Sequence, residues 1–398
     1  MNNKKSKWIS IPFVVIIIGI FLIHIVSKDK EISASENRTL AQKPTIQDFK
    51  FEKYTSEFES YFSDQFPFRE ELSEIYSKVQ IVLGKNKIKN YYLLDDNWIM
   101  PTPSKSMSEK ELKDAANEIN ELSKIASDSN KKVYYVSTPN KESMLAHLYP
   151  KYVDGLKNDI SNKNAFKSYL DLETINVIDV DEHFLKEFNE SQREDLYFKT
   201  DHHWNGIGAY EGFKCIIEDM NIVNNISWDS YTQTMYDKGY FLGSYNKNLN
   251  KLVKEDETIP YVHLKEKPNY EYYKFDGKTE TKCKEEDVIA TRKNEKEILY
   301  GGAYMFGNAC SILKIRNEDA LSDKKILIIR DSYQAPTSWL FADIFSEVQL
   351  VDPRYIDKLD ISIDDIIRDS KADLVMFMYN TSDFKMMIDV MKEQREKS

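Results

Sequence analysis

Short apolar runs alternate with amphipathic segments through the C-terminal two thirds of the chain. Five of these runs resemble strands buried on both faces, and they lie at residues 133–136, 177–180, 326–329, 347–351 and 374–378. The intervening segments place apolar residues at helical spacing. This alternation predicts a doubly wound α/β fold with a parallel sheet. Active sites in such sheets lie outside the carboxyl ends of the strands.

The beginning of the chain has a different pattern. Residues 8–26 contain no acidic or basic side chain apart from His24, and three lysines precede them. As a helix this run would span roughly 28 Å, close to the hydrocarbon thickness of a bilayer. We therefore expect a cytoplasmic tail at 1–7, an uncleaved transmembrane anchor at 8–26 and a stalk at 27–48, with the rest exported. A cleaved signal peptide is the alternative, and it leads to the same exported domain.

The exported chain divides into a helical part at residues 49–130 and an α/β catalytic domain at residues 131–398. Periodicity predicts helices at 49–62, from Pro67 to near Gly84 and at 107–127, a strand and turn at 91–101, and further helices at about 162–172, 207–220, 336–346, 362–369 and the C-terminus. Residues 222–315 are rich in Tyr, Lys and Glu and alternate in short runs. They predict a β-rich insertion.

Charge and cysteine content narrow the classes of function. The net charge is −11, and it becomes −15 without residues 1–28, which hold four lysines and no acidic residue. Such acidity excludes nucleic acid as a partner and disfavours strongly anionic acceptors such as teichoic polymers. Three cysteines are too few for a disulfide scaffold or a four-cysteine zinc site. Cys215 is predicted to lie in the core, and a bridge between Cys283 and Cys310 is left open.

The strand at 326–329 runs into a serine that has the position of a nucleophile. Ser332 follows the strand and precedes a predicted helix, whose free N–H groups could stabilise an oxyanion. The alternative is that Ser332 only caps this helix, because serine is a favoured N-cap residue.

A second polar cluster could supply the base. Asp201 and His203 are two residues apart, so both side chains can point to one side of an extended loop. A carboxylate that accepts from one imidazole nitrogen leaves the other nitrogen free to deprotonate Ser332. A metal site formed by Asp201, His202 and His203 is disfavoured, since adjacent ligands seldom converge on one ion. A purely structural loop is the remaining alternative.

These residues resemble a known family. Residues 201–204, Asp-His-His-Trp, match the signature from which the DHHW protein family takes its name. Five further segments resemble family motifs in family order: residues 35–41 (ENR-x-L-A), 64–69 (D-x-F-P-x-R), 138–141 (P-x-K), 331–333 (D-S-[YF]) and 352–355 (D-x-R-Y). The family is similar in turn to the SGNH-like proteins of alginate O-acetylation, which are extracytoplasmic acyltransferases.

The resemblance implies roles for individual residues. Asp201 orients the base, His203 is the base and Ser332 is the nucleophile, while His202 occupies a variable position. Because the nucleophile follows the Asp-His pair, the resemblance implies a circularly permuted SGNH hydrolase-like fold. Arg330 stands where the family usually has glycine before Asp-Ser.

Six further residues are candidates for substrate or oxyanion contacts. Arg354 and Tyr355 follow a predicted strand, Asn380 follows the last one, and Lys141 lies in the loop after the first. Tyr333 adjoins the nucleophile, and Trp204 could pack against the histidine ring or offer a stacking face to a sugar. Three of the others have a structural alternative: an ion pair for Arg354, a loop start for Asn380 and a solvated side chain for Lys141.

The expected function is O-acetylation of a secreted or cell-wall polysaccharide through an acyl-serine, without cofactor or metal. The resemblance implies a membrane-bound O-acyltransferase partner as acetyl donor. An esterase with the same triad is one alternative, because the two differ only in which hydroxyl attacks the acyl-serine. A non-catalytic polysaccharide-binding or assembly protein is the other.

Overall fold

The structure is a computed structural model that describes residues 3–33, 38–44, 51–236, 240–254, 257–288, 297–304, 311–356, 359, 361–380 and 384–396. Its α-helices are α1 (Asn3–Val26), α2 (Phe51–Asp64), α3 (Arg69–Val82), α4 (Glu109–Asp128), α5 (Lys141–Met144), α6 (Asn158–Lys167), α7 (Val180–Glu187), α8 (Glu190–Glu194), α9 (Gly206–Met220), α10 (Ser244–Asn248), α11 (Tyr300–Tyr304), α12 (Ser338–Ile344), α13 (Ile363–Asp369) and α14 (Phe384–Arg395). The predicted helix at about 162–172 therefore begins and ends earlier, as α6.

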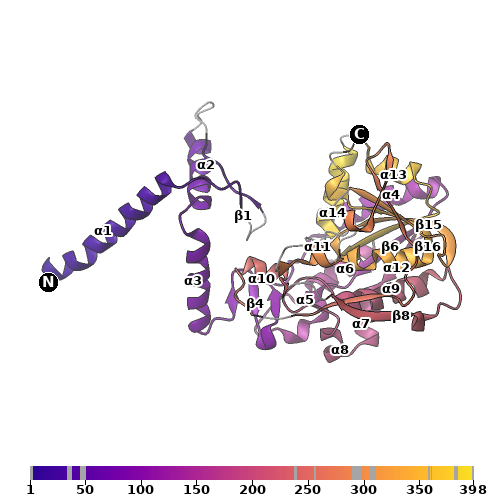
Figure 1. The fold of residues 1–398 in the computed structure, drawn as a ribbon, viewed down its shortest axis with the longest axis horizontal. Helices are drawn as coiled ribbons and strands as arrows, with labels where there is room; N and C mark the ends of the chain where they lie inside the picture. Colours follow the sequence, from indigo (N-terminus) through magenta and orange to yellow (C-terminus); the bar gives the residue numbers. More distant parts are fainter. Residues whose placement is uncertain are drawn as a thin grey trace. The chain divides into compact units, whose positions relative to one another are not determined.

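The chain forms two compact units (Figure 1). One holds residues 1–89 with 246–252, and the other holds residues 90–245 with 253–398. The boundary between the units falls near residue 89. The sequence placed it at 130, but α4 packs on the central sheet of the second unit and therefore belongs to that unit.

The first unit contains α1, α2 and α3, a two-stranded ribbon of β1 (Ile32–Ser33) and β2 (Arg38–Thr39), and β3 (Lys87–Ile88). Among the described residues, no helix is both long enough and apolar enough to cross a bilayer. The transmembrane anchor predicted at residues 8–26 is therefore not supported. The family-like segment at 35–41 lies partly outside the described residues.

An eight-stranded sheet forms the centre of the second unit, in the order β12-β11-β14-β16-β15-β17-β6-β7. The five predicted strands are confirmed, and they pair in parallel: β7 (Ile175–Asp179), β6 (Lys132–Thr138), β17 (Leu374–Asn380), β15 (Ser322–Arg330) and β16 (Phe345–Val351). The strand that leads to Ser332, β15, lies between β16 and β17, and its last five residues, 326–330, are buried.

The sheet is mixed, which corrects the prediction of a purely parallel one. The predicted insertion contributes three antiparallel strands to one edge: β14 (Ile312–Arg316), β11 (Glu271–Phe275) and β12 (Glu280–Cys283). Other strands of the insertion pair outside the sheet, namely β8 (Tyr231–Tyr236) with β10 (Ile259–Leu264) and β9 (Tyr240–Phe241) with β13 (Glu297–Ile298). Short alternating runs in the sequence indicated strands but not their partners.

Helices cover both faces of the sheet, and the alternation of side chains along the strands separates two cores. On β15, Leu327 and Ile329 face the core that α4, α6, α13 and α14 cover. Ile326 and Ile328 face the opposite core, which α7, α9 and α12 cover. Cys215 lies in this second core, as predicted, and Cys283 is a free, partly buried cysteine. Cys310 lies outside the described residues.

Candidate active site

Ser332 lies where the sheet's buried strand β15 meets a short 3-10 helix, η6 (Ser332–Thr337). Asp331 caps this helix: its Oδ1 accepts from the Tyr333 N–H at 2.8 Å, and its Oδ2 accepts from the Asn380 N–H at 2.7 Å. The N-cap alternative for Ser332 is therefore wrong, because the N-cap residue of η6 is the preceding Asp331. The Ser332 hydroxyl is left half-buried and available for chemistry.

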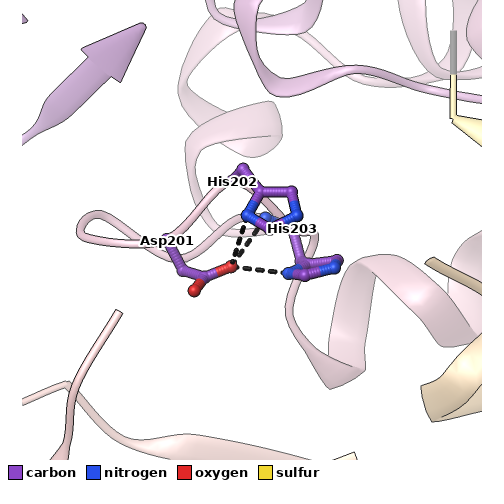
Figure 2. A group of neighbouring side chains, drawn as sticks. All are labelled: Asp201, His202 and His203. Carbon is purple, nitrogen blue, oxygen red and sulfur yellow. Dashed lines mark hydrogen bonds and ion pairs between the residues drawn. The ribbon is translucent and has the colours of Figure 1, made fainter. Parts of the chain in front are cut away.

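Asp201 and His203 lie on the loop before α9, and their side chains point toward each other (Figure 2). Asp201 Oδ1 is 2.6 Å from His203 Nδ1 and accepts the His203 backbone N–H at 3.0 Å. Asp201 Oδ2 accepts the Ser244 N–H at 2.6 Å. Both carboxylate oxygens are thus occupied, which fixes the carboxylate and directs the Nδ1 proton of His203 toward it.

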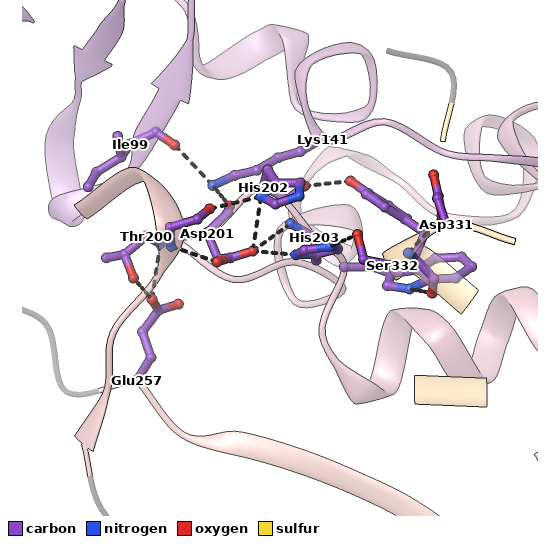
Figure 3. A network of polar contacts seen from close by, with 12 residues as sticks. Ile99, Lys141, Thr200, Asp201, His202, His203, Glu257, Asp331 and Ser332 are labelled. Atoms are coloured by element: carbon purple, nitrogen blue, oxygen red, sulfur yellow. Dashed lines mark hydrogen bonds and ion pairs between the residues drawn. The ribbon is translucent and has the colours of Figure 1, made fainter. Parts of the chain in front are cut away.

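The second nitrogen of His203 reaches the serine. His203 Nε2 is 2.8 Å from Ser332 Oγ, so a continuous chain of hydrogen bonds joins Asp201, His203 and Ser332 (Figure 3). The structure therefore brings together the three residues that the sequence proposed as catalytic. This geometry can transfer a proton from the hydroxyl to the imidazole.

Burial and charge set the protonation of this chain of hydrogen bonds. Burial alone would raise the pKa of Asp201, but the imidazoles of His203 and His202 and the Ser244 N–H hold that pKa well below its usual range. Burial lowers the pKa of His203, and Asp201 offsets this only in part. His203 is therefore neutral at neutral pH, as a general base must be.

Lys141 has a role that the sequence did not predict. It is fully buried, and its Nζ donates to the backbone carbonyls of Ile99, Lys199 and Asp201 at 3.0, 2.8 and 2.9 Å (Figure 3). A substrate cannot reach this ammonium group. Burial lowers the pKa of Lys141, while the nearby carboxylates of Glu257 and Asp201 oppose that shift.

Glu257 supports the same loop from the other side, and the sequence analysis missed it. Its carboxylate accepts the backbone N–H groups of Lys199 and Thr200 and the Thr200 hydroxyl (Figure 3). Gly243 also passes close to this loop, where an added Cβ would lie 2.2 Å from the Thr200 carbonyl oxygen. Glu257 lies in the insertion, and no sequence motif connects it to residue 200.

Trp204 and Tyr333 form a buried aromatic pair next to His203. Trp204 is fully buried, and its Nε1 donates to the Tyr333 carbonyl at 2.9 Å. Tyr333 is also buried, and its hydroxyl donates to the His202 carbonyl. The indole packs against the Tyr333 ring at 5.5 Å. The suggestion that Trp204 offers a stacking face to a sugar is therefore wrong, because the indole has no exposed face.

The three remaining candidates differ in exposure. Arg354 is half-buried and binds the Asp352 carboxylate through Nε and Nη2 at 2.8 and 2.6 Å, which is the predicted ion-pair alternative. Tyr355 is 42% exposed and is accessible to a substrate. Asn380 is buried beside Asp331, next to the turn that carries Ser332. Roles for these three in substrate or oxyanion binding stay predictions.

Tyr300 is the aromatic residue of the site that the sequence did not single out. Its ring lies parallel to the His203 imidazole, with 3.5 Å between centroids and 3° between planes. It belongs to α11, within the insertion, 97 residues after His203. The sequence around it has no motif that indicates a site.

Asp201, His202 and His203 hold their ligand atoms within 4.8 Å of one another, a spacing that a metal ion could use. Two of the three are already committed: Asp201 to the His203 ring and the Ser244 N–H, and His203 to Asp201 and Ser332. His202 Nδ1 is 2.8 Å from Ser244 Oγ. A metal ion would have to break these contacts, so the donor set fits a proton-transfer site better than a metal site.

Comparison with known proteins places the domain in a recognised class. The family model of the SGNH hydrolase-like domain of acetyltransferase AlgX matches residues 95–263. This range contains Asp201 and His203 and ends before Ser332. This segment of the chain is therefore similar to an acetyltransferase-type SGNH domain. No curated protein is significantly similar in sequence.

Solved structures confirm the fold. PatB1 of Bacillus cereus gives a TM-score of 0.64 at 24% identity, and the match covers 74% of this chain and 97% of PatB1. PatB1 with a sulfonyl adduct gives the same TM-score at 22% identity, over 75% of this chain and 97% of that one. A DHHW family protein from Eubacterium siraeum gives 0.56 at 19% identity, over 76% and 96%. The resemblance to the DHHW family and its SGNH-like relatives, predicted from the sequence, is thereby confirmed.

Proposed function

We propose that this protein is an O-acetyltransferase that transfers an acetyl group through an acyl-Ser332 intermediate to a hydroxyl of a polysaccharide. The observation that supports it most is the continuous hydrogen-bond chain from Asp201 through His203 to Ser332 Oγ. Asp201 and His203 lie in the segment that is similar to the SGNH hydrolase-like domain of acetyltransferase AlgX.

In the first half-reaction, His203 Nε2 accepts the Ser332 proton as Oγ attacks the carbonyl carbon of the acetyl donor. The resulting imidazolium then gives this proton to the leaving oxygen of the donor, and the acetyl ester of Ser332 is formed. Asp201 keeps the Nδ1 proton oriented throughout and stabilises the imidazolium without itself becoming protonated.

In the second half-reaction, a sugar hydroxyl gives its proton to His203 Nε2 and attacks the ester carbon. The proton returns to Ser332 Oγ as the bond between Oγ and the acetyl carbon breaks. The Ser332 N–H is a suitable oxyanion donor because it opens η6, whereas the Tyr333 N–H is already bound to Asp331. Water in place of the sugar would give the esterase reaction.

The proposal includes an extracytoplasmic location, since acylation of a secreted or wall polysaccharide takes place there. Without acetyl-CoA in that compartment, the donor would be a membrane-bound O-acyltransferase. The charge of −15 outside residues 1–28 favours a neutral or weakly charged polymer.

Ser332→Ala tests the proposal. The full chain is incubated with an aryl acetate, with and without an oligosaccharide acceptor, and acetate, acetylated sugar and intact protein mass are measured. We expect the wild type to carry one acetyl group on Ser332 and to acetylate the sugar. The variant should lose about 10⁴-fold or more in rate because no nucleophile remains.

Ser338→Ala is the matched control, since Ser338 is a buried serine whose hydroxyl binds only the Gln334 and Ala335 oxygens among the contacts described. Acetate release without acetylated sugar would replace the transferase by an esterase. Unchanged acetyl transfer by Ser332→Ala would reject the acyl-Ser332 mechanism. A wild type that neither releases acetate nor acetylates the sugar would favour a binding or assembly protein.

A further inference from the structure

The stacked pair of Tyr300 and His203 is not required by the hydrogen-bond chain that joins Asp201 to Ser332. The two rings are 3.5 Å apart and parallel within 3°, and both side chains are buried. The Tyr300 hydroxyl makes no hydrogen bond to any residue that the structure describes. What Tyr300 offers the site is therefore the face of its ring.

Tyr300 is held in place by contacts around α11. The next turn of that helix carries Tyr304, whose hydroxyl accepts the Gly206 N–H at 3.1 Å and donates to the Pro260 carbonyl. Just before α11, β13 pairs with β9, and the Leu242 N–H donates to the Ile298 carbonyl at 2.9 Å. The insertion is thus joined to the start of α9, directly after the Asp201–Trp204 loop.

Several charged and titratable groups of the described residues surround His203. Asp201 binds Nδ1, the His202 ring lies 3.6 Å away, and the Tyr333 ring lies 5.0 Å away. The guanidinium of Arg354 disfavours the imidazolium but is itself paired with Asp352. Glu257 and Lys141 act on the loop rather than the ring. Tyr300 is the group whose π face lies flat against the imidazole.

The imidazole becomes positive in each proton transfer, and a buried site has little water to stabilise that charge. A cation over the face of an aromatic ring is attracted by the ring's quadrupole, most strongly when both are desolvated. We propose that Tyr300 is a positioning residue of the base, which keeps the His203 ring in the plane that reaches Ser332 and stabilises the imidazolium by a cation–π contact. This inference rests on the function proposed above. It gives the insertion a role in catalysis.

The test compares Tyr300→Leu, which removes the π face, with Tyr300→Phe, which keeps it. Because the hydroxyl makes no described hydrogen bond, the phenylalanine variant breaks none. Tyr152→Leu, at a position 66% exposed, is the surface control. The full chain is labelled at histidine, the His203 signals are assigned with His203→Gln, and the His203 pKa is measured by NMR titration alongside the pH dependence of aryl acetate turnover.

We expect Tyr300→Leu to lower the His203 pKa by about one unit, and to move the acidic limb of kcat/KM to lower pH by the same amount. The ring-current shift of the His203 protons should disappear with it. Tyr300→Phe should keep the wild-type His203 pKa and the ring-current shift. A His203 pKa equal in the wild type and Tyr300→Leu would overturn the inference.

The NMR titration does not depend on turnover, so it separates this inference from the proposed function. A wild type without acyl transfer, but with a His203 pKa that Tyr300→Leu lowers, would reject the transferase and keep the stacking effect. If Tyr300→Leu does not fold, Tyr300→Met fills a similar volume without a π face, and the same two outcomes apply. Circular dichroism and the melting temperature confirm folding before either variant is compared.

Discussion

Asp201 is the residue whose two oxygens fix the geometry of the base. One oxygen accepts from the His203 ring and backbone, and the other accepts the Ser244 N–H. Every one of these partners donates a hydrogen. A carboxylate satisfies them all, and it does so in its ionised form, because its pKa is held far below the usual range.

Asp201→Asn should therefore lower kcat by about 10³ to 10⁴-fold with little change in stability. The amide offers one acceptor oxygen, so its NH₂ group would oppose either His203 or Ser244 and favour the wrong tautomer of the imidazole. Turnover of an aryl acetate and thermal unfolding measure the two effects. Asp219→Asn, on the exposed side of α9, is the control. Activity within tenfold of the wild type would show that Asp201 is not needed to orient the base.

The protonation of His203 predicts the acidic limb of the pH profile. The base works only when neutral, so kcat/KM should rise with pH through the His203 pKa. Burial lowers that pKa from its ordinary value of about 6.5, and the midpoint should lie below this value. Initial rates with an aryl acetate between pH 4 and about 9 check this. A midpoint at or above about 6.5 would contradict the effect of burial on the imidazole.

At the scale of elements, the buried ammonium group of Lys141 holds the active-site loop in place. Lys141 begins α5 at the end of β6, and it joins β5 (Ile99–Pro101) to the carbonyls of Lys199 and Asp201. One ammonium group therefore joins strand β5 to two carbonyls of the active-site loop. Buried carbonyl oxygens without a donor are destabilising, so this arrangement depends on the lysine.

Lys141→Met should destabilise the protein by about 3 kcal/mol, because three buried carbonyls lose their donor while the chain volume is kept. The carbonyl of Asp201 is one of them, so activity should also fall, by about tenfold or more. Urea unfolding measures the first effect and ester turnover the second. Lys151→Met, at an exposed position, should change neither. Equal stability of the Lys141 variant and the wild type would show that Lys141 is not needed to hold the loop.

At the scale of the whole molecule, each contact of the candidate site comes from one unit. Residues 90–245 and 253–398 supply the eight-stranded sheet, both hydrophobic cores and the chain from Asp201 to Ser332. The helices α1 to α3 belong to the other unit. The second unit has enough buried apolar surface to fold cooperatively.

A chain that begins at residue 90 should therefore keep cooperative unfolding and hydrolyse an aryl acetate within about threefold of the full chain, an estimate for distant, independent parts. Near-UV circular dichroism, thermal unfolding and initial rates check it. The same truncation with Ser332→Ala serves as the inactive control. A truncated chain that is folded but inactive would show that the first unit takes part in the chemistry.

The sequence predicted the local features of the fold because these depend on near neighbours. The five parallel strands and most helices were predicted, since a buried strand needs an apolar run and a surface helix needs one apolar face. The partners of the insertion's strands were not, because alternation identifies a strand without saying where it pairs. Hence the antiparallel edge of β11, β12 and β14 was missed.

The sequence by itself singled out the three residues that we propose to react. Asp201, His203 and Ser332 stand out because few residue types perform acyl transfer and because their spacing matches a known motif. Only the tertiary structure decided how they are supported: Asp331 rather than Ser332 caps the helix, Lys141 is buried under the loop, Trp204 has no exposed face, and Glu257 and Tyr300 come from the insertion. The physical reason is burial. Whether a polar or aromatic side chain meets solvent, a carbonyl or another ring depends on segments far away in the chain, and no local pattern contains that information.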